Sequence, residues 1–209
     1  DYLHYRPIDI DLWYPSAIVA TDTPLLFHNI LGLLEKRANY YTASNAADGF
    51  TQQIAGYFCT GFNCSNSTTL LNYKTESFSN ASTVEGKFPL IIYMCAYNGM
   101  SYENYTLLEA LAKKGFVVAS ISSIGRFPGD MTMHQEDLME QVNDAVIALS
   151  TLKHSSNIDY SKIGIVGYSW GGLAGAVLAG KISNAACLIS LEGSEFHHYG
   201  FAKEEDSSF

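Results

Sequence analysis

The sequence has few basic residues and no long hydrophobic run. Its 209 residues include only 12 lysines and arginines against 21 aspartates and glutamates, for a net charge of −9 at pH 7. Nucleic acid is bound through clusters of positive charge, and no basic run is present, so it is disfavoured as a partner. No apolar stretch reaches the roughly 20 residues that cross a bilayer. These absences favour an acidic enzyme that acts on small neutral substrates.

Charged residues are scarce as well, at 16% against 47% hydrophobic residues. This proportion is enough for one sizeable core and argues against disorder, so we expect a single domain over residues 1–209. The stretch from Tyr40 to about Gly86 differs in being rich in Asn, Ser, Thr and Gly. We interpret the region at about 20–75 as a helical and loop excursion that carries local specificity, with a helix near residues 50–58.

Only four cysteines occur. Cys59 and Cys64 frame a four-residue loop and could close as a disulfide in an oxidising compartment. Cys95 and Cys187 lie in apolar stretches, where we expect small buried hydrophobic residues. Four Asn-x-Ser/Thr sequons are also present, at Asn63, Asn66, Asn80 and Asn104. Together these features favour an extracellular or periplasmic location, with a cytoplasmic one as the alternative.

The first elements expected are an edge strand and an apolar helix. Ile8, Ile10 and Leu12 alternate with aspartates, which predicts a half-buried antiparallel strand. Thr23 before Pro24 predicts the start of a helix, and leucines and isoleucines follow at largely helical spacing up to residue 34. This helix has two interpretations. It either packs over a sheet, or it forms a mobile apolar lid over an ester pocket that also touches lipid.

From residue 87 on, apolar runs alternate with helical patterns. Strands are expected at 90–95, 116–121, 163–166 and 186–191, and helices at 102–114, 135–152 and 170–180. Because each buried apolar run is followed by a helix, the order predicts an α/β fold: a doubly wound, mostly parallel central sheet flanked by helices.

A glycine-rich motif follows the strand expected at 163–166. It reads Gly167-Tyr168-Ser169-Trp170-Gly171-Gly172 and precedes a small-residue segment, which predicts strand, sharp turn and helix. Glycines two residues before and after such a serine are needed because a Cβ would collide with the neighbouring strand or helix. We therefore predict a nucleophile elbow that presents Ser169 at a helix N-terminus, where negative charge is favoured. The alternative is a Gly/Ser-rich loop that merely ends a strand.

Acyl transfer by a serine also needs two hydrogen-bond donors for the oxyanion. The first expected donor is the backbone N–H of Trp170, the residue after the nucleophile. The second should come from the loop that follows the strand ending at Cys95. Tyr97 is our first choice for that N–H and Asn98 the second.

The acid and the base of a catalytic triad are expected after Ser169. Glu192 ends the strand after the elbow helix and is the candidate acid, with Glu195 as fallback; a solvated glutamate at a strand end is the alternative. His197 and His198 are the only downstream histidines and therefore the candidate bases. A base normally follows two further strand and helix units, so we expect a C-terminal portion to be missing. No further ligand stands at a metal-binding spacing from the two histidines, and no metal site is predicted.

Four further stretches each resemble part of a known family's sequence. They are Trp13-Tyr14-Pro15, residues 87–93, residues 111–119 and residues 158–164. With the elbow, they resemble the α/β-hydrolase superfamily, and more narrowly its dienelactone-hydrolase-like and platelet-activating-factor-acetylhydrolase-like branch. The resemblance covers most of the chain outside roughly residues 20–75. It implies an α/β-hydrolase fold without its C-terminal strands, and a serine esterase, lipase or acetylhydrolase that uses no cofactor.

The resemblance also implies Ser169 as nucleophile and an acid after the next strand. Acetylhydrolases of this branch place an aspartate at a similar interval, so Glu192 is a conservative departure. Dienelactone hydrolases use a cysteine nucleophile, and Ser169 argues against that activity. The loop at 95–99 lacks the usual His-Gly pair, and no histidine stands at the position of the family's final one.

These observations predict a serine hydrolase that cleaves carboxylic esters through an acyl-enzyme. Its expected partners are small-molecule or lipid-like ester substrates, with transient contact to a lipid surface. The alternative is a catalytically incomplete hydrolase-fold module used for binding. The sequence predicts no oligomeric state.

Overall fold

The computed structural model describes residues 6–42, 44–125 and 131–193. The chain divides into two compact units. Among the described residues, those between 17 and 82 form the helical unit, and those from 6 to 16 and from 83 to 193 form the sheet unit. The excursion expected at about 20–75 lies within the helical unit. That both units belong to one domain stays a prediction.

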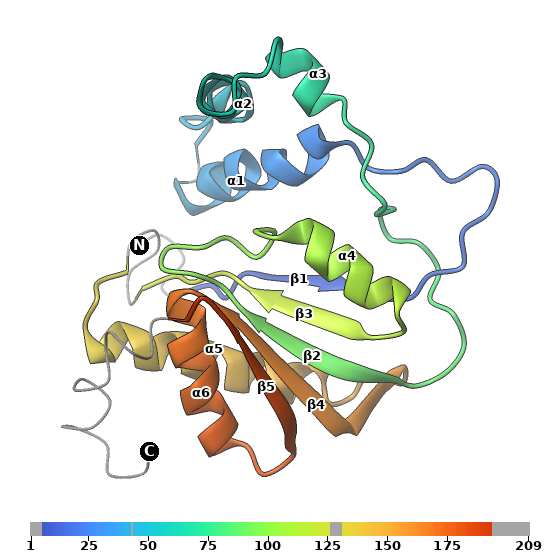
Figure 1. Ribbon diagram of the computed structural model, residues 1–209, viewed down its shortest axis with the longest axis vertical. Helices are drawn as coiled ribbons and strands as arrows, with labels where there is room; N and C mark the ends of the chain where they lie inside the picture. Colours follow the sequence, from blue (N-terminus) through green and yellow to red (C-terminus); the bar gives the residue numbers. More distant parts are fainter. Residues whose placement is uncertain (1–5, 43, 126–130, 194–209) are drawn as a thin grey trace. The chain divides into compact units, whose positions relative to one another are not determined.

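The sheet unit contains a five-stranded sheet in the order β1-β3-β2-β4-β5 (Figure 1). Its strands are β1 (Ile10–Trp13), β2 (Phe88–Met94), β3 (Val117–Ile121), β4 (Ile158–Tyr168) and β5 (Ala185–Leu191). β1 pairs antiparallel with β3, and the other neighbours pair in parallel. The mostly parallel α/β sheet and its antiparallel opening strand are thus confirmed.

Three helices cover both faces of this sheet: α4 (Tyr105–Lys113), α5 (Gln135–Leu152) and α6 (Trp170–Lys181). Alternate residues of β2 enter two separate cores. Leu90, Ile92 and Met94 pack with side chains of α5 and α6, whereas Ile91 and Tyr93 pack with side chains of α4. This two-sided burial explains why the central strand is a continuous apolar run in the sequence.

β5 departs from that pattern because it is the last strand in the order and, among the described residues, pairs only with β4. Leu188 and Ile189 are 39% and 50% exposed. Cys95 is buried as expected, but Cys187 is exposed, so the prediction of a buried thiol there was wrong.

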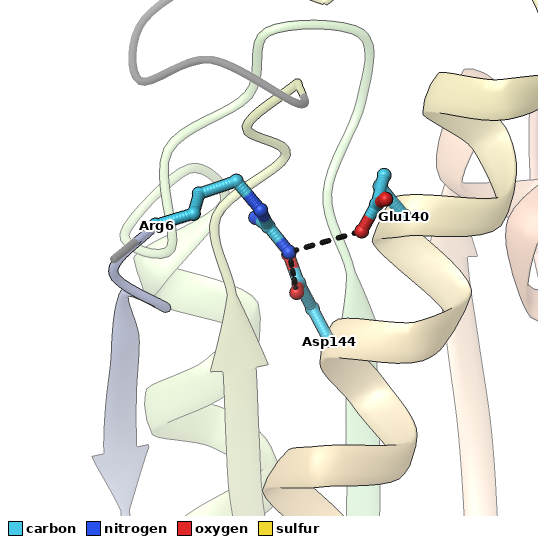
Figure 2. A network of polar contacts seen from close by, with 3 residues as sticks. All are labelled: Arg6, Glu140 and Asp144. Carbon is cyan, nitrogen blue, oxygen red and sulfur yellow. Dashed lines mark hydrogen bonds and ion pairs between the residues drawn. The ribbon is translucent and has the colours of Figure 1, made fainter. Parts of the chain in front are cut away.

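An ion-pair network joins the start of the chain to α5 (Figure 2). The Arg6 guanidinium donates to both carboxylate oxygens of Asp144 and lies 3.3 Å from Glu140 Oε2. Only 1% of the Asp144 side chain is exposed. Burial raises the pKa of Asp144, and the Arg6 guanidinium opposes that rise.

The helical unit consists of α1 (Phe27–Thr42), α2 (Phe50–Gly61) and α3 (Ser67–Leu71). Its small core gathers one buried residue from each helix, namely Leu31, Ala55 and Leu71. A disulfide joins Cys59, in the last turn of α2, to Cys64, which lies just beyond the end of this helix. The helix expected near residues 50–58 is confirmed as α2. In the described part of the chain, no helix has both the length and the apolar character needed to span a membrane.

α1 begins three residues later than the Pro24 start that the sequence predicts. The backbone N–H of Leu25 donates to the Ser77 carbonyl at 2.7 Å, and the Leu25 carbonyl accepts from the N–H of Thr75 at 2.8 Å. These bonds hold Leu25 in a bridge to a distant segment, so it cannot enter the helix. The Asn29 side chain accepts from the N–H of Leu26 at 2.8 Å, near the helix start.

Candidate active site

Ser169 stands at the junction of β4 and α6 in a strained backbone conformation. Its φ is 52° and its ψ is −123°, a combination that residues with a side chain rarely adopt. The Ser169 N–H donates to the Leu191 carbonyl at 3.0 Å, and the Ser169 carbonyl accepts from Gly172 N–H at 2.8 Å. Strand pairing on one side and the first helical turn on the other therefore fix the bend. The serine is half-buried, so the bend does not enclose it in the core.

The glycines that flank this serine have no room for a side chain. A Cβ on Gly167 would collide with the backbone of Gly171, and a Cβ on Gly171 would collide with the backbone oxygens of Met94 and Cys95. The first turn of α6 thus packs directly against the ends of β4 and β2. This is the strand-turn-helix geometry expected of a nucleophile elbow.

Trp170, the residue after Ser169, is buried in the core of the sheet unit. Only 1% of this residue is exposed, and it belongs to the core between the sheet and helices α5 and α6. As the first residue of α6, it places its backbone N–H at the N-terminus of this helix, directly after Ser169. Its indole ring meets the Tyr97 ring edge-on, with the ring centroids 6.3 Å apart. The two residues predicted to supply the oxyanion donors therefore lie side by side.

The loop after β2 is held by a dense set of hydrogen bonds. Ala96 N–H donates to Glu103 Oε1 at 2.7 Å. The Tyr97 hydroxyl donates to the Met131 carbonyl at 2.6 Å, and the Asn98 side-chain oxygen accepts from Met131 N–H at 2.7 Å. In the described part of the chain, the backbone N–H of Tyr97 meets no acceptor.

Three ionisable groups lie next to this loop: Tyr93 and Cys95 are buried, and Glu103 is half-buried. The Tyr93 hydroxyl donates to Glu103 Oε1 at 3.2 Å and accepts from the Asn104 side-chain amide at 2.7 Å. Burial raises the pKa of the Glu103 carboxyl. It also raises the pKa of Tyr93 and of the Cys95 thiol, so both stay protonated at neutral pH. Cys95 therefore lacks the thiolate character of a nucleophile.

Of the predicted acid and bases, the structure describes only Glu192. Glu192 directly follows Leu191, the residue whose carbonyl fixes Ser169, and it bends the chain at φ 51° with an exposed side chain. Glu195, His197 and His198 lie outside the described residues. Within residues 6–42, 44–125 and 131–193, no histidine hydrogen-bonds to Ser169 or Glu192. No three His, Cys, Asp or Glu residues in those ranges are grouped to hold a metal ion.

Two residues that contact the loop were not singled out from the sequence. Glu103 follows Ala96 by seven positions, and no spacing rule connects them. Gln141 lies within α5, and its Nε2 donates to the Cys95 carbonyl at 2.8 Å. The sequence did hold a signal for Gln141: it is a polar residue on the apolar side of a helix, three positions after Leu138 and four before Ala145.

The model of the dienelactone hydrolase family matches residues 78–199, more than half of the chain. A search of curated proteins found no match. Among solved structures, a ferulic acid esterase from Streptomyces cinnamoneus is 17% identical with a TM-score of 0.57, over 84% of this chain and 48% of that one. Est1E from Butyrivibrio proteoclasticus is 20% identical with a TM-score of 0.47, over 57% and 49% of the two chains.

A dienelactone hydrolase candidate from Klebsiella pneumoniae is 15% identical with a TM-score of 0.45, over 54% of this chain and 51% of that one. The chain thus spans about half the length of these solved structures. The likeness to the Streptomyces esterase shows the fold, of which this chain contains a part. Together with the family match, which begins near the start of the sheet unit's second segment, it confirms the resemblance read from the motifs. The chain belongs to the dienelactone hydrolase family and has the α/β-hydrolase fold.

Proposed function

We propose that this protein hydrolyses carboxylic esters through an acyl-enzyme formed on Ser169. The observation that carries the proposal is the strained φ of 52° at Ser169, between glycines that cannot accept a Cβ. Strain of this kind persists where the surrounding structure enforces it, and it concentrates at active sites. Ser169 Oγ attacks the ester carbonyl, the alcohol leaves, and water then releases the acyl group.

The N–H groups of Trp170 and Tyr97 hold the oxyanion in this proposal. The first lies at the N-terminus of α6, whose dipole favours negative charge. The second is supported by the bonding of its neighbour: Ala96 N–H is already committed to Glu103, so the next N–H along the loop is the available one. Asn98 remains the alternative donor.

Proton transfer needs a base that hydrogen-bonds to the nucleophile and an acid that orients this base. We assign Glu192 as the acid because its backbone adjoins the residue that pairs with Ser169. His197 and His198 are the candidate bases. No step in this mechanism calls for a cofactor or a metal ion.

The proposed substrates are esters of small molecules or lipids. The Streptomyces protein of the same fold is named as a ferulic acid esterase, which supports ester hydrolysis but not a particular acyl group. We also propose export from the cytosol, supported by the Cys59–Cys64 disulfide, since cytosolic thiols are kept reduced.

Labelling with a fluorophosphonate tests the central proposal. Intact-mass measurement of the wild-type protein should show one adduct, and peptide mapping should place it on Ser169. Ser169→Ala should abolish both the adduct and the hydrolysis of p-nitrophenyl acetate. Ser150→Ala, at an exposed position of α5, should leave both unchanged. Hydrolysis that survives Ser169→Ala would refute the assignment, and a wild-type protein without an adduct would favour the binding module.

The proposed transient contact with lipid is tested by removing the helical unit. Tyr57 and Phe62, on and just after α2, are 76% and 82% exposed, and exposed aromatic side chains favour a lipid interface. Ser16 and Thr83 pair as an antiparallel bridge, so a short Gly/Ser linker can replace residues 17–82. The shortened protein should lose binding to phosphatidylcholine vesicles and keep Ser169 labelling. Equal vesicle binding by both proteins would rule out this surface.

A further inference from the structure

We propose that Glu103 and Gln141 are positioning residues that clamp one peptide group so that the N–H of Tyr97 is aimed at the oxyanion. This inference rests on the proposed function and adds two residues to its machinery. Neither residue is proposed to touch substrate. Their role is to fix the backbone of the loop that follows β2.

The clamp acts on the peptide group between Cys95 and Ala96. Gln141 Nε2 donates to its carbonyl oxygen at 2.8 Å, and its N–H donates to Glu103 Oε1 at 2.7 Å. A peptide group is planar, and its carbonyl and N–H point in opposite directions. Holding both ends therefore fixes the orientation of the plane, with one residue acting from α5 and the other from just before α4.

The next peptide group, between Ala96 and Tyr97, is held in place in turn. Its carbonyl accepts from Gly99 N–H at 2.8 Å, which closes a tight turn. The N–H of Tyr97 must then point away from that turn. The Tyr97 hydroxyl and the Asn98 side chain hold the outer side of the turn on Met131.

The clamp is also in direct contact with the elbow. Gly171, in the first turn of α6, approaches the Cys95 carbonyl so closely that a Cβ would collide with it. Gly99 likewise has no room for a Cβ, because the Glu103 carboxylate and the Ala96 backbone lie there. The bonded peptide, the elbow and the turn therefore form one packed assembly. A shift of the peptide plane would move the Tyr97 donor relative to Ser169.

Both residues are unfavourable choices for stability alone. Gln141 is 0% exposed, and within the described residues its Oε1 has no hydrogen-bond partner, an arrangement that lowers stability. An apolar residue would continue the surface formed by Leu138 and Ala145. Glu103 places a carboxyl in a setting where burial raises its pKa. A buried polar atom without a partner calls for an explanation, and the clamp supplies one.

The experiment measures the kinetics of full-length variants on p-nitrophenyl acetate. Gln141→Leu and Glu103→Leu should each lower kcat by about 10- to 100-fold, below the effect of deleting an oxyanion donor outright. KM should change less than threefold, because the ground-state ester does not depend on this donor. Glu103→Gln keeps an oxygen acceptor for Ala96 N–H and should restore most of the activity. Gln135→Leu, at the start of α5, is the matched control and should behave as wild type.

The rescue by Glu103→Gln separates positioning from a general loss of structure. Fluorophosphonate labelling of Ser169 should slow in parallel with kcat in both leucine variants, while their circular dichroism at 25 °C stays that of wild type. If Gln141→Leu does not fold, the comparison of Glu103→Leu with Glu103→Gln alone tests the clamp. Glu103 is only half-buried, so both of these variants should fold. Leucine variants with wild-type kcat and labelling rates would overturn the clamp and leave the proposed function intact. A wild-type protein that neither labels nor hydrolyses would overturn both.

Discussion

The sheet unit and the helical unit are stabilised in different ways. In the sheet unit, helices on both faces of a parallel sheet enclose two cores, and the backbone groups around Ser169 are fixed by strand pairing and close packing. The helical unit has one small core and a disulfide. The family match begins at residue 78, so it falls almost wholly in the sheet unit. The family match is therefore concentrated in the unit whose packing leaves the backbone least freedom.

Glycine-to-alanine substitutions should expose this difference most strongly. Gly171→Ala places a Cβ against the Met94 and Cys95 oxygens and should destabilise the protein by about 3 kcal/mol, with loss of Ser169 labelling. Gly56→Ala, in α2, places its Cβ in open space and should stabilise the helical unit by about 0.5–1 kcal/mol. Urea denaturation measures both changes. Equal effects at the two positions would show that packing does not distinguish the two units.

The Arg6 network provides the next largest effect. Arg6→Met removes the cation that faces the buried Asp144 carboxylate and should cost about 3 kcal/mol in the free energy of unfolding. Asp144→Asn added to Arg6→Met should recover part of this loss, because no charge then remains buried. Thermal unfolding of the single and the double variant measures both changes in stability. A double variant no more stable than Arg6→Met would show that the arginine acts through packing of its stem.

Loss of the disulfide should act on the helical unit alone. Replacing Cys59 and Cys64 with serine removes a short cross-link and should destabilise this unit by about 2 kcal/mol. Hydrogen exchange followed by mass spectrometry should show faster exchange in α2 and unchanged protection in β2 and β4. Faster exchange in the strands as well would mean that the two units unfold as one.

The sequence was informative about the sheet unit because its signals are local. Gly167 and Gly171 flank Ser169 at fixed spacing, and the long helix at 135–152 follows from periodicity and ends where expected. The start of α1 could not be read in the same way, since Leu25 is held by residues 50 and 52 positions later in the chain, Thr75 and Ser77. The peptide clamp was missed for the same reason. Cys95, Glu103 and Gln141 come together only once β2 and α5 have packed.

Glu103 yields the smallest and most specific effect, a pH-dependent change in stability confined to the sheet unit. Its native pKa is raised above the ordinary value of 4.5, so the native state binds this proton more tightly than the unfolded state does. The stabilisation that this provides is complete below pH 4.5 and is lost as the pH rises through the native pKa. Glu103→Gln has no proton to lose there. The Tm of this variant minus that of wild type should therefore be more positive at pH 7 than at pH 4. Glu85→Gln, at an exposed position, controls for the removed charge, and a Tm difference for Glu103→Gln that is equal at both pH values would contradict the raised pKa.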